Sequence, residues 1–190
     1  MNCNGECSSC KSTCSITCPK CKAPGMEVPS ITVASLCDST INLDETHYLC
    51  LRPNCDVVYF DENGKMYEKD KVNVPVWFKS KYDEYMVCYC REIYLKDVVR
   101  AVFELGGCEN KKEILTYLGK GESKGMCIVK NPTGKPCDEL FVNAIAYANK
   151  IYKKHQEENQ SNFRNTAFFY GHFSFVNNRS SAYCLFNFIK

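Results

Sequence analysis

Eight cysteines fall into two groups of four whose spacings are typical of two different metal sites. The first quartet combines the pairs in CPKC and CLRPNC: Cys18, Cys21, Cys50 and Cys55. The second quartet combines CYC with two cysteines that flank the segment IVKNPTGKP: Cys88, Cys90, Cys127 and Cys137. Four closed tetrahedral ligands in short-spaced pairs suit zinc, whereas a 2Fe–2S cluster needs four thiolates shared between two irons. The sequence therefore offers a candidate site of each kind.

The first quartet has the pattern of a structural zinc site. A Cys-x2-Cys knuckle turns tightly enough for both sulfurs to lie about 2.3 Å from one zinc ion, and the second pair completes the tetrahedron. Chance spacing in a cysteine-rich chain and a redox-active pair are the alternatives. A closed four-thiolate zinc has no open coordination position, so we expect it to stabilise a fold whose own apolar core is small.

The second quartet departs from the zinc-ribbon pattern. In an extended strand the sulfurs of Cys88 and Cys90 would lie too far apart for one iron, so we expect this segment to turn. The loop NPTGKP could present backbone N–H groups to the sulfurs, and a helix after Cys137 could add its N-terminus. Such donors would raise the reduction potential of a cluster. A second zinc site and plain thiols remain the alternatives.

Bulk composition narrows the class of protein. The chain has 190 residues with 15 cysteines, an odd number that metal ligation accommodates better than a disulfide framework. Its formal net charge of +2 gives no reason to expect nucleic acid or a membrane as partner. The N-terminal MNCNGECSSC lacks the basic and apolar regions of an export signal, so we expect a cytoplasmic protein that keeps its thiols reduced.

The expected fold class is α+β, with a small zinc-ribbon-like β half joined to a helical half that binds a 2Fe–2S cluster. In the β half we expect strands at VPSITV, DVVYF and KVNVPVWF, and a turn at DENGK. The expected organisation is a Cys/Ser-rich arm at 1–15, a zinc-binding β subdomain at 16–85, a helical 2Fe–2S-binding subdomain at 86–158, and a Phe/Asn-rich tail of uncertain structure at 159–190.

Three helices are predicted in the second half of the chain. The first starts near Lys96 and stops at Gly106 and Gly107, and Asn110 is a good N-cap for the second, KKEILTYL. The third should start after Cys137 and fray in KKHQEENQ. Its predicted buried stripe is Phe141, Ile145, Ala148 and Tyr152.

The remaining cysteines and histidines have weaker patterns. The N-terminal arm carries four cysteines that could surround one soft ion such as Cu(I) or a second zinc, or could form a solvated arm that scavenges metal: Cys3, Cys7, Cys10 and Cys14. We expect Cys37 and Cys108 to pack as small apolar side chains. His47 precedes Cys50 by three positions, but four thiolates already complete the zinc site, so we expect it at the surface.

Several motifs together resemble a known family. CPKC, YLCLRPNCDVVYF and VPVWFK, followed by CYC and CxxxNPTGKxC, are similar to the N-terminal domain of CopZ-type copper chaperones, whose 2Fe–2S module resembles bacterioferritin-associated ferredoxins. The resemblance runs from about Ile16 to about Tyr152. It implies zinc on the first quartet and a 2Fe–2S cluster on the second. Pro136 stands where family members often have a further cysteine, which leaves Cys137 as the ligand.

The resemblance implies cofactors more strongly than it implies copper delivery. Copper chaperones of this type carry a separate copper module with an MxCxxC loop, and this sequence contains no such motif. No general base or activated nucleophile accompanies the cysteines, so we expect an electron carrier or metal-handling protein rather than an enzyme. One-electron exchange with an unknown redox partner, or with copper ions by reduction of Cu(II) to Cu(I), is the leading hypothesis. A non-redox zinc-binding interaction module is the alternative.

Overall fold

The computed structural model of the protein describes residues 16–37, 40–121 and 125–167, with side chains up to Gln160. The chain divides into two compact units, Met1–Tyr152 and Lys153–Lys190. The cysteines of the N-terminal arm and most of the predicted tail lie outside the described residues. No described helix combines the length and the apolar composition that a membrane-spanning segment requires.

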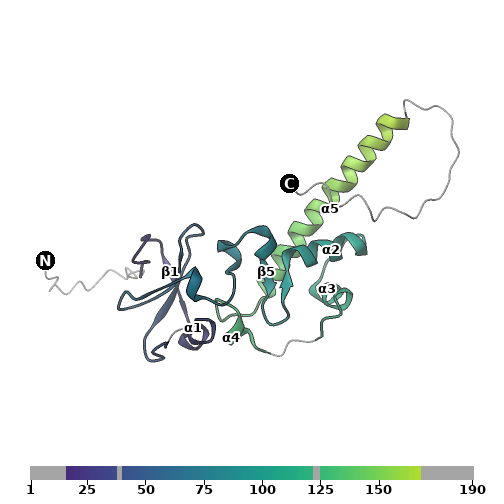
Figure 1. Ribbon diagram of the computed structural model, residues 1–190. Helices are drawn as coiled ribbons and strands as arrows, with labels where there is room; N and C mark the ends of the chain where they lie inside the picture. Colours follow the sequence, from purple (N-terminus) through teal and green to yellow (C-terminus); the bar gives the residue numbers. More distant parts are fainter. Residues whose placement is uncertain (1–15, 38–39, 122–124, 168–190) are drawn as a thin grey trace, which may run out of the picture. The chain divides into compact units, whose positions relative to one another are not determined.

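The first half of the larger unit is a four-stranded antiparallel sheet (Figure 1). Its strands follow one another in chain order: β1 (Gly25–Val28), β2 (His47–Cys50), β3 (Val57–Asp61) and β4 (Met66–Glu68). The predicted turn at DENGK joins β3 to β4, and Gly64 adopts a φ of +85° there. A helix, α1 (Ser30–Leu36), lies between β1 and β2 in the chain.

The two faces of the sheet carry different chemistry. Leu49, Tyr59 and Tyr67 are paired across β2, β3 and β4, and they share an apolar cluster with Val33 of α1. Tyr48 and Phe60, one position along, are paired on the opposite face and stack with ring centroids 5.6 Å apart. Phe60 belongs to a cluster with three cysteines of the first quartet. Because side chains alternate between the two faces of a strand, one face of the sheet packs against α1 and the other packs against the cysteines of the first quartet.

Two of the predicted strands are wrong. Most of VPSITV forms α1, in which Thr32, Val33 and Leu36 are buried at helical spacing. The segment KVNVPVWF contains only short 3-10 turns, η1 (Lys69–Lys71) and η2 (Trp77–Lys79), and a single bridge between Val72 and Cys37. The strand predicted at DVVYF is confirmed as β3.

The second half is mainly helical. A 3-10 turn, η3 (Tyr82–Glu84), precedes a two-stranded ribbon of β5 (Met86–Cys88) and β6 (Ile93–Tyr94). Four helices follow: α2 (Leu95–Leu105), α3 (Lys111–Tyr117), α4 (Cys127–Lys130) and α5 (Asp138–Ala167). The protein therefore has the predicted α+β fold, with a β-sheet half and a helical half.

Local signals in the sequence set the ends of these helices. Gly106 closes α2 in the left-handed region at φ +73°, which glycine adopts without the Cβ penalty of other residues. The side chain of Asn110 accepts a hydrogen bond from the Glu113 N–H of α3, as predicted for an N-cap. The predicted fraying of the third helix is wrong, because α5 continues through the polar KKHQEENQ to Ala167.

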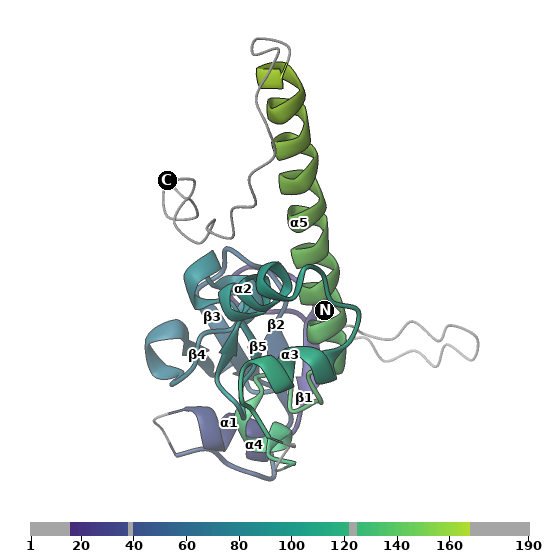
Figure 2. The same cartoon turned by 90° about the vertical axis from the view of Figure 1, so that its right-hand side faces the viewer.

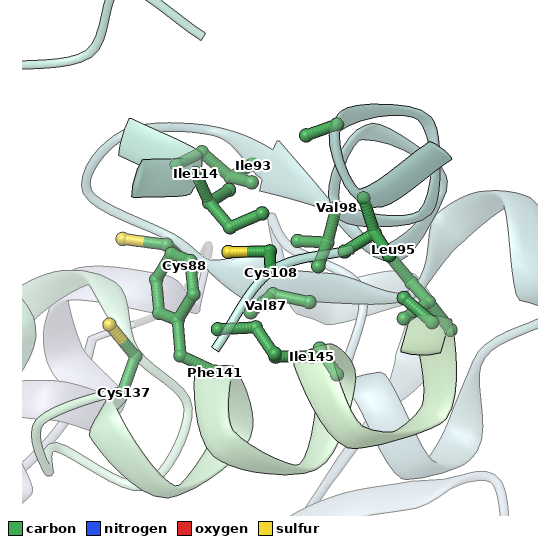
Figure 3. Close-up of a cluster of buried hydrophobic side chains, with 14 residues drawn as sticks. Val87, Cys88, Ile93, Leu95, Val98, Cys108, Ile114, Cys137, Phe141 and Ile145 are labelled. Atoms are coloured by element: carbon green, nitrogen blue, oxygen red, sulfur yellow. The ribbon is translucent and has the colours of Figure 1, made fainter. Parts of the chain in front are cut away.

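The helical half has one continuous apolar core (Figure 3). Phe141, Ile145 and Ala148 of α5 are buried there with Val98 of α2 and Ile114 of α3, so the α5 stripe is confirmed for these three residues. Tyr152 packs at the edge of the core and meets the Phe103 ring edge-on at 5.4 Å. Cys108 lies inside this core and donates its thiol to the Asn110 carbonyl, which fits its expected packing role.

The two halves are joined where α4 lies beside α1 (Figures 1 and 2). The buried Thr32 of α1 donates a hydrogen bond of 2.6 Å to the carbonyl of Ile128 in α4. The buried Tyr59 hydroxyl of β3 donates one of 2.8 Å to the carbonyl of Pro132 in the NPTGKP loop. The sheet half thus holds the segment between Cys127 and Cys137 by one buried hydrogen bond, from Tyr59, and one partly buried hydrogen bond, from Thr32.

We predict that Gly134→Ala destabilises this joint. Gly134 has a φ of +69°, and an added Cβ would lie 2.7 Å from the Thr32 Oγ1 and 2.9 Å from the Pro29 Cδ. The left-handed backbone costs an alanine roughly 1–2 kcal/mol, and overpacking adds roughly 1–3 kcal/mol. Chemical denaturation of the zinc-loaded protein measures the loss.

Two other glycines provide matched controls for this substitution. Gly119 also has a positive φ, +62°, but a Cβ there meets nothing within 4 Å, so Gly119→Ala should lose only the backbone contribution. Gly121 has an open site without a positive φ, so Gly121→Ala should leave the free energy of unfolding nearly unchanged. Equal losses at Gly134 and Gly119 would contradict the close approach to α1.

Candidate metal centres

The first quartet is brought together by a turn before β1 and by the loop between β2 and β3. Cys18 and Cys21 lie in a turn closed by hydrogen bonds from the Cys18 N–H to the Ala23 carbonyl and from the Lys22 N–H to the Cys18 carbonyl, both 2.9 Å. Cys50 ends β2, and Cys55 lies just before β3. Because β1 pairs with β2 at Gly25 and Cys50, the strand register brings the first knuckle next to the second.

The four sulfurs of the first quartet all lie within 4.8 Å of one another, and those of Cys21 and Cys50 are 3.6 Å apart. Zn–S bonds of 2.3 Å in a tetrahedron place the sulfurs about 3.8 Å apart. The side chains of Cys18, Cys50 and Cys55 are buried, and that of Cys21 is half-buried. The arrangement is therefore a closed cage of the size that one zinc ion requires.

Backbone N–H groups point at the sulfurs of this cage. Burial raises the pKa of Cys21, but a hydrogen bond from the Ala23 N–H and contacts with the other thiols outweigh burial and lower it to about 7. Burial raises the pKa of Cys50 to about 12, although the Arg52 N–H partly opposes this. The N–H groups of Ala23 and Arg52 thus favour the thiolate forms of Cys21 and Cys50, which are the forms that bind a metal.

Lys79, at the end of η2, holds the loop of the second knuckle. Its ammonium group donates hydrogen bonds to the carbonyls of Arg52 at 2.5 Å and Cys55 at 3.2 Å. Burial lowers the pKa of Lys79, while the charges of nearby thiolates raise it. A lysine in this position complements the negative charge of a four-thiolate metal centre. The sequence pattern did not identify it, because Lys79 is separated from the knuckle by two strands.

The second quartet is assembled from three separate segments. Cys88 ends β5, and Cys90 lies in the turn to β6, so the predicted turn at CYC is confirmed. Cys127 begins the short helix α4, and Cys137 immediately precedes α5, where its carbonyl accepts the Phe141 N–H at 3.0 Å. Figure 3 shows the sulfurs of Cys88 and Cys137 directed to the same side of the core, beyond the Phe141 ring.

The spread of the second quartet differs from that of the first. The sulfurs of Cys88 and Cys90 are 3.5 Å apart. A hydrogen bond from the Cys137 thiol lowers the pKa of Cys88 to about 5, with help from Cys90 and Arg91 and against burial. Among the described residues, however, no three of the four sulfurs lie within 4.8 Å of one another. The quartet is thus gathered at one place but is more open than a mononuclear zinc cage.

Charged side chains, rather than the NPTGKP loop, face these sulfurs. The loop's amide groups bond elsewhere: the Asn131 N–H to the Cys127 carbonyl, and those of Thr133, Gly134 and Lys135 within the loop. The prediction that these amides point at the sulfurs is therefore wrong. Instead, the Arg91 guanidinium donates to the Cys88 sulfur at 3.8 Å and to the Gly121 carbonyl at 2.8 Å.

A second cation lies near Cys137. Lys111 forms an ion pair of 2.7 Å with Asp138 at the start of α5, and its ammonium lies 5.0 Å from the centre of the Phe141 ring. Its charge counteracts the rise of the Cys137 pKa that the pairing with Cys88 and burial cause. Arg91 and Lys111 therefore place positive charge on two sides of the second quartet, and sequence analysis had identified neither.

Comparison with known proteins indicates which metal the first quartet suits. Residues 15–73 match a family described as a zinc binding domain of the CopZ type. The match contains the whole first quartet and the four strands of the sheet. It supports zinc as the metal of this half of the protein.

A longer stretch is similar to a copper chaperone. Over 122 residues the chain is 29% identical to the copper chaperone CopZ of Archaeoglobus fulgidus, a match that covers 63% of this chain and 57% of that protein. The X-ray structure of the CopZ N-terminal domain from the same organism aligns with a TM-score of 0.50 and 27% identity, over 64% of this chain and 92% of that domain. The chain thus corresponds to just over half the length of that chaperone, and to nearly all of its N-terminal domain.

We predict that Lys79→Met accelerates loss of zinc from the knuckle. Without the ammonium group the carbonyls of Arg52 and Cys55 lose their donor, and outer-sphere contacts of this kind change metal affinity by about 10–100-fold. Transfer of zinc to a chromophoric chelator at neutral pH measures the rate, and we expect an increase of about tenfold. Lys81→Met is the control, because Lys81 is exposed and has no such contact with the knuckle. Equal rates in the two variants would exclude a role for Lys79.

Proposed function

We propose that Cys18, Cys21, Cys50 and Cys55 hold a structural zinc ion. The family match supports the metal, and the convergence of four mostly buried sulfurs within 4.8 Å supports these ligands. All four positions of the tetrahedron are filled by protein, so the ion has no site for a substrate. Its role is to tie the turn before β1 to the loop between β2 and β3, and so to stabilise the sheet that contacts α4.

We further propose that the second quartet binds a 2Fe–2S cluster. The observation that carries this proposal is the spread of its sulfurs: those of Cys88 and Cys90 are 3.5 Å apart and the Cys137 thiol donates to Cys88, but among the described residues no three of the four form a compact group like the zinc cage. Two irons separate their thiolate ligands into two pairs, whereas one zinc would draw all four together. The low pKa of Cys88 and the cations around the site favour thiolates, which both kinds of centre require.

A cluster at this site would supply one-electron redox chemistry. The chain's own residues set its environment: Arg91 donates to a ligand sulfur, Lys111 lies near Cys137, and the N-terminus of α5 follows Cys137 directly. Each favours the more negative, reduced state and therefore raises the potential. The half-buried Cys90 and Cys127 leave one side of the site accessible to a redox partner.

The function that we propose is one-electron transfer linked to copper handling. The similarity to a copper chaperone supports copper as the context. An electron that leaves the reduced site would convert one Cu(II) to one Cu(I). A non-redox module, with zinc in both quartets, remains compatible with the zinc half and is distinguished by the experiments below.

The first experiment is analysis of anaerobically purified protein. We expect visible absorption, about two irons and two sulfides per chain, and one zinc that survives loss of the cluster. Cys137→Ser should abolish the colour and retain zinc. Cys108→Ala is the matched control, because Cys108 is a buried thiol of the same core that lies outside the quartet, and it should retain the colour. A colourless wild-type protein with a zinc ion that Cys137→Ser loses and Asp61→Asn retains would establish the non-redox alternative.

We predict that Arg91→Gln lowers the reduction potential of the cluster. Removing a positive donor from the Cys88 sulfur destabilises the reduced state, so the midpoint should fall by tens of millivolts, where about 59 mV corresponds to a tenfold change for a one-electron couple. Arg91→Lys should recover part of the loss, and Arg100→Gln, on the exposed surface of α2, should have no effect. An unchanged midpoint in Arg91→Gln would contradict the proposed role of the guanidinium group.

Copper reduction is tested with protein whose excess dithionite has been removed. Adding Cu(II) without oxygen should reoxidise the visible spectrum and yield one Cu(I), trapped by a Cu(I)-specific chelator, per cluster. Cys137→Ser should yield none through this route. A reduced spectrum that stays unchanged after Cu(II) addition would remove the copper reaction and leave electron transfer to a protein partner.

A further inference from the structure

The end of the sheet away from the zinc knuckle contains a second group of possible metal ligands. His47 of β2 pairs in register with Asp61 of β3, so their side chains lie on the same face. Glu45 lies two positions before His47, and the ligand atoms of the three side chains all lie within 4.8 Å of one another. His47 and Cys50 are three positions apart, so this group lies on the face opposite to the cysteines and about 10 Å along the strand.

His47 is fully buried, which corrects the prediction of a surface position. Its Nδ1 lies 2.9 Å from the Glu45 carbonyl and 3.1 Å from the Ser30 hydroxyl, which itself donates to that carbonyl at 2.7 Å. A carbonyl can only accept, so Nδ1 donates this bond and Nε2 is the ring nitrogen left for a further partner. That Nε2 has no hydrogen-bond partner among the described residues. Metal-bound histidines have this arrangement, with the other ring nitrogen donating to a carbonyl.

The carboxylate of Asp61 likewise has one buried oxygen without a hydrogen-bond partner among the described residues. It is 2% exposed, and its Oδ1 accepts the N–H groups of Asn63 and Lys65 at 3.0 and 2.9 Å. These bonds fix the carboxylate, while Oδ2 is buried without a partner in the described part of the chain. Glu45 is half-buried and uses one oxygen to accept from Asn42 at 3.2 Å. Two buried polar atoms without a partner, on side chains that share one face of the sheet, are unfavourable unless a cation or water satisfies them.

We propose that Glu45, His47 and Asp61 form a further metal site, separate from both cysteine quartets, for a divalent first-row transition ion such as Zn²⁺. One imidazole and two carboxylates suit such ions better than Mg²⁺ or Ca²⁺, which prefer oxygen ligands alone. Bonds of about 2.0–2.2 Å would require Glu45 to move inward slightly, and water would complete the coordination. The site is independent of both cysteine quartets and of the proposed redox function.

The positive charge of Lys65 balances the carboxylates of this site and would repel an incoming metal ion. Its exposed side chain lies over the Tyr67 ring at 5.2 Å, and Tyr67 raises its pKa, as do the charges of Asp61 and Glu45. The ammonium group therefore partly neutralises the carboxylates when no ion is bound. An exposed lysine can swing away, but its charge weakens cation binding. Removing that charge should strengthen binding, which a purely structural role of the three residues does not predict.

The experiment is calorimetric titration of the full-length chain with Zn²⁺, after nitrilotriacetate has removed weakly bound metal. We expect one class of sites that Asp61→Asn and Glu45→Gln weaken at least tenfold. Glu62→Gln, which neutralises an exposed carboxylate next to Asp61, should leave this class unchanged. Lys65→Met should tighten it severalfold, and Mg²⁺ should not compete. Isotherms of Asp61→Asn and Glu45→Gln that match Glu62→Gln would overturn the proposal.

A spectroscopic measurement on the wild-type protein covers the case in which a variant fails to fold. Long-range ¹H–¹⁵N spectra resolve the ring nitrogens of the chain's three histidines. Saturating Zn²⁺ should shift the Nε2 resonance of His47 and leave its Nδ1–H in place. An unshifted Nε2 at saturation, or competition by Mg²⁺ at equal concentration, would exclude an imidazole-ligated site.

Discussion

Thiol groups that converge on one point must stay protonated or share a cation, because adjacent thiolates repel each other in a buried site. Much of the larger unit is organised by this constraint. The first quartet is gathered by strand register and by two short turns, and amide groups with Lys79 compensate its charge. The second is gathered by a ribbon, a one-turn helix and the start of α5, with Arg91 and Lys111 as counter-charges. In each set the pKa of one thiol, Cys21 or Cys88, is lowered, while burial raises the pKa of Cys50, and pairing with Cys88 together with burial raises the pKa of Cys137.

The sequence predicted those features whose signals are local. Short spacing predicted the Cys18–Cys21 knuckle and the turn between Cys88 and Cys90, because a knuckle or a tight turn brings neighbouring residues together whatever the rest of the chain does. Asn110 and Gly106 marked helix ends for the same reason, since a cap acts on its own turn. The division into a β half and a helical half followed from a change of period near Lys96, and the general architecture agrees with it.

Features that depend on tertiary contacts could not be read from the sequence. The residues from Ile31 to Val33 are rich in β-branched side chains and favour a strand, but they form α1 because Thr32 bonds to α4 and Val33 packs on the sheet. His47 was expected at the surface, yet its position opposite Asp61 depends on a strand register that spacing does not reveal. Lys79 lies far in sequence from the knuckle that it contacts. Arg91 follows Cys90 directly, but arginine is usually found at the protein surface, so the sequence gave no signal for either contact.

The joint between α1 and α4 has a consequence for how the protein is assembled. Two thiols of the second quartet flank a segment that is anchored to the sheet through Tyr59 and Thr32, whereas the other two belong to the ribbon of the helical half. The relative positions of these two pairs of thiols therefore depend on an intact sheet. A change that loosens the sheet half would also displace one pair of thiols from the other, although none of the four belongs to β1–β4.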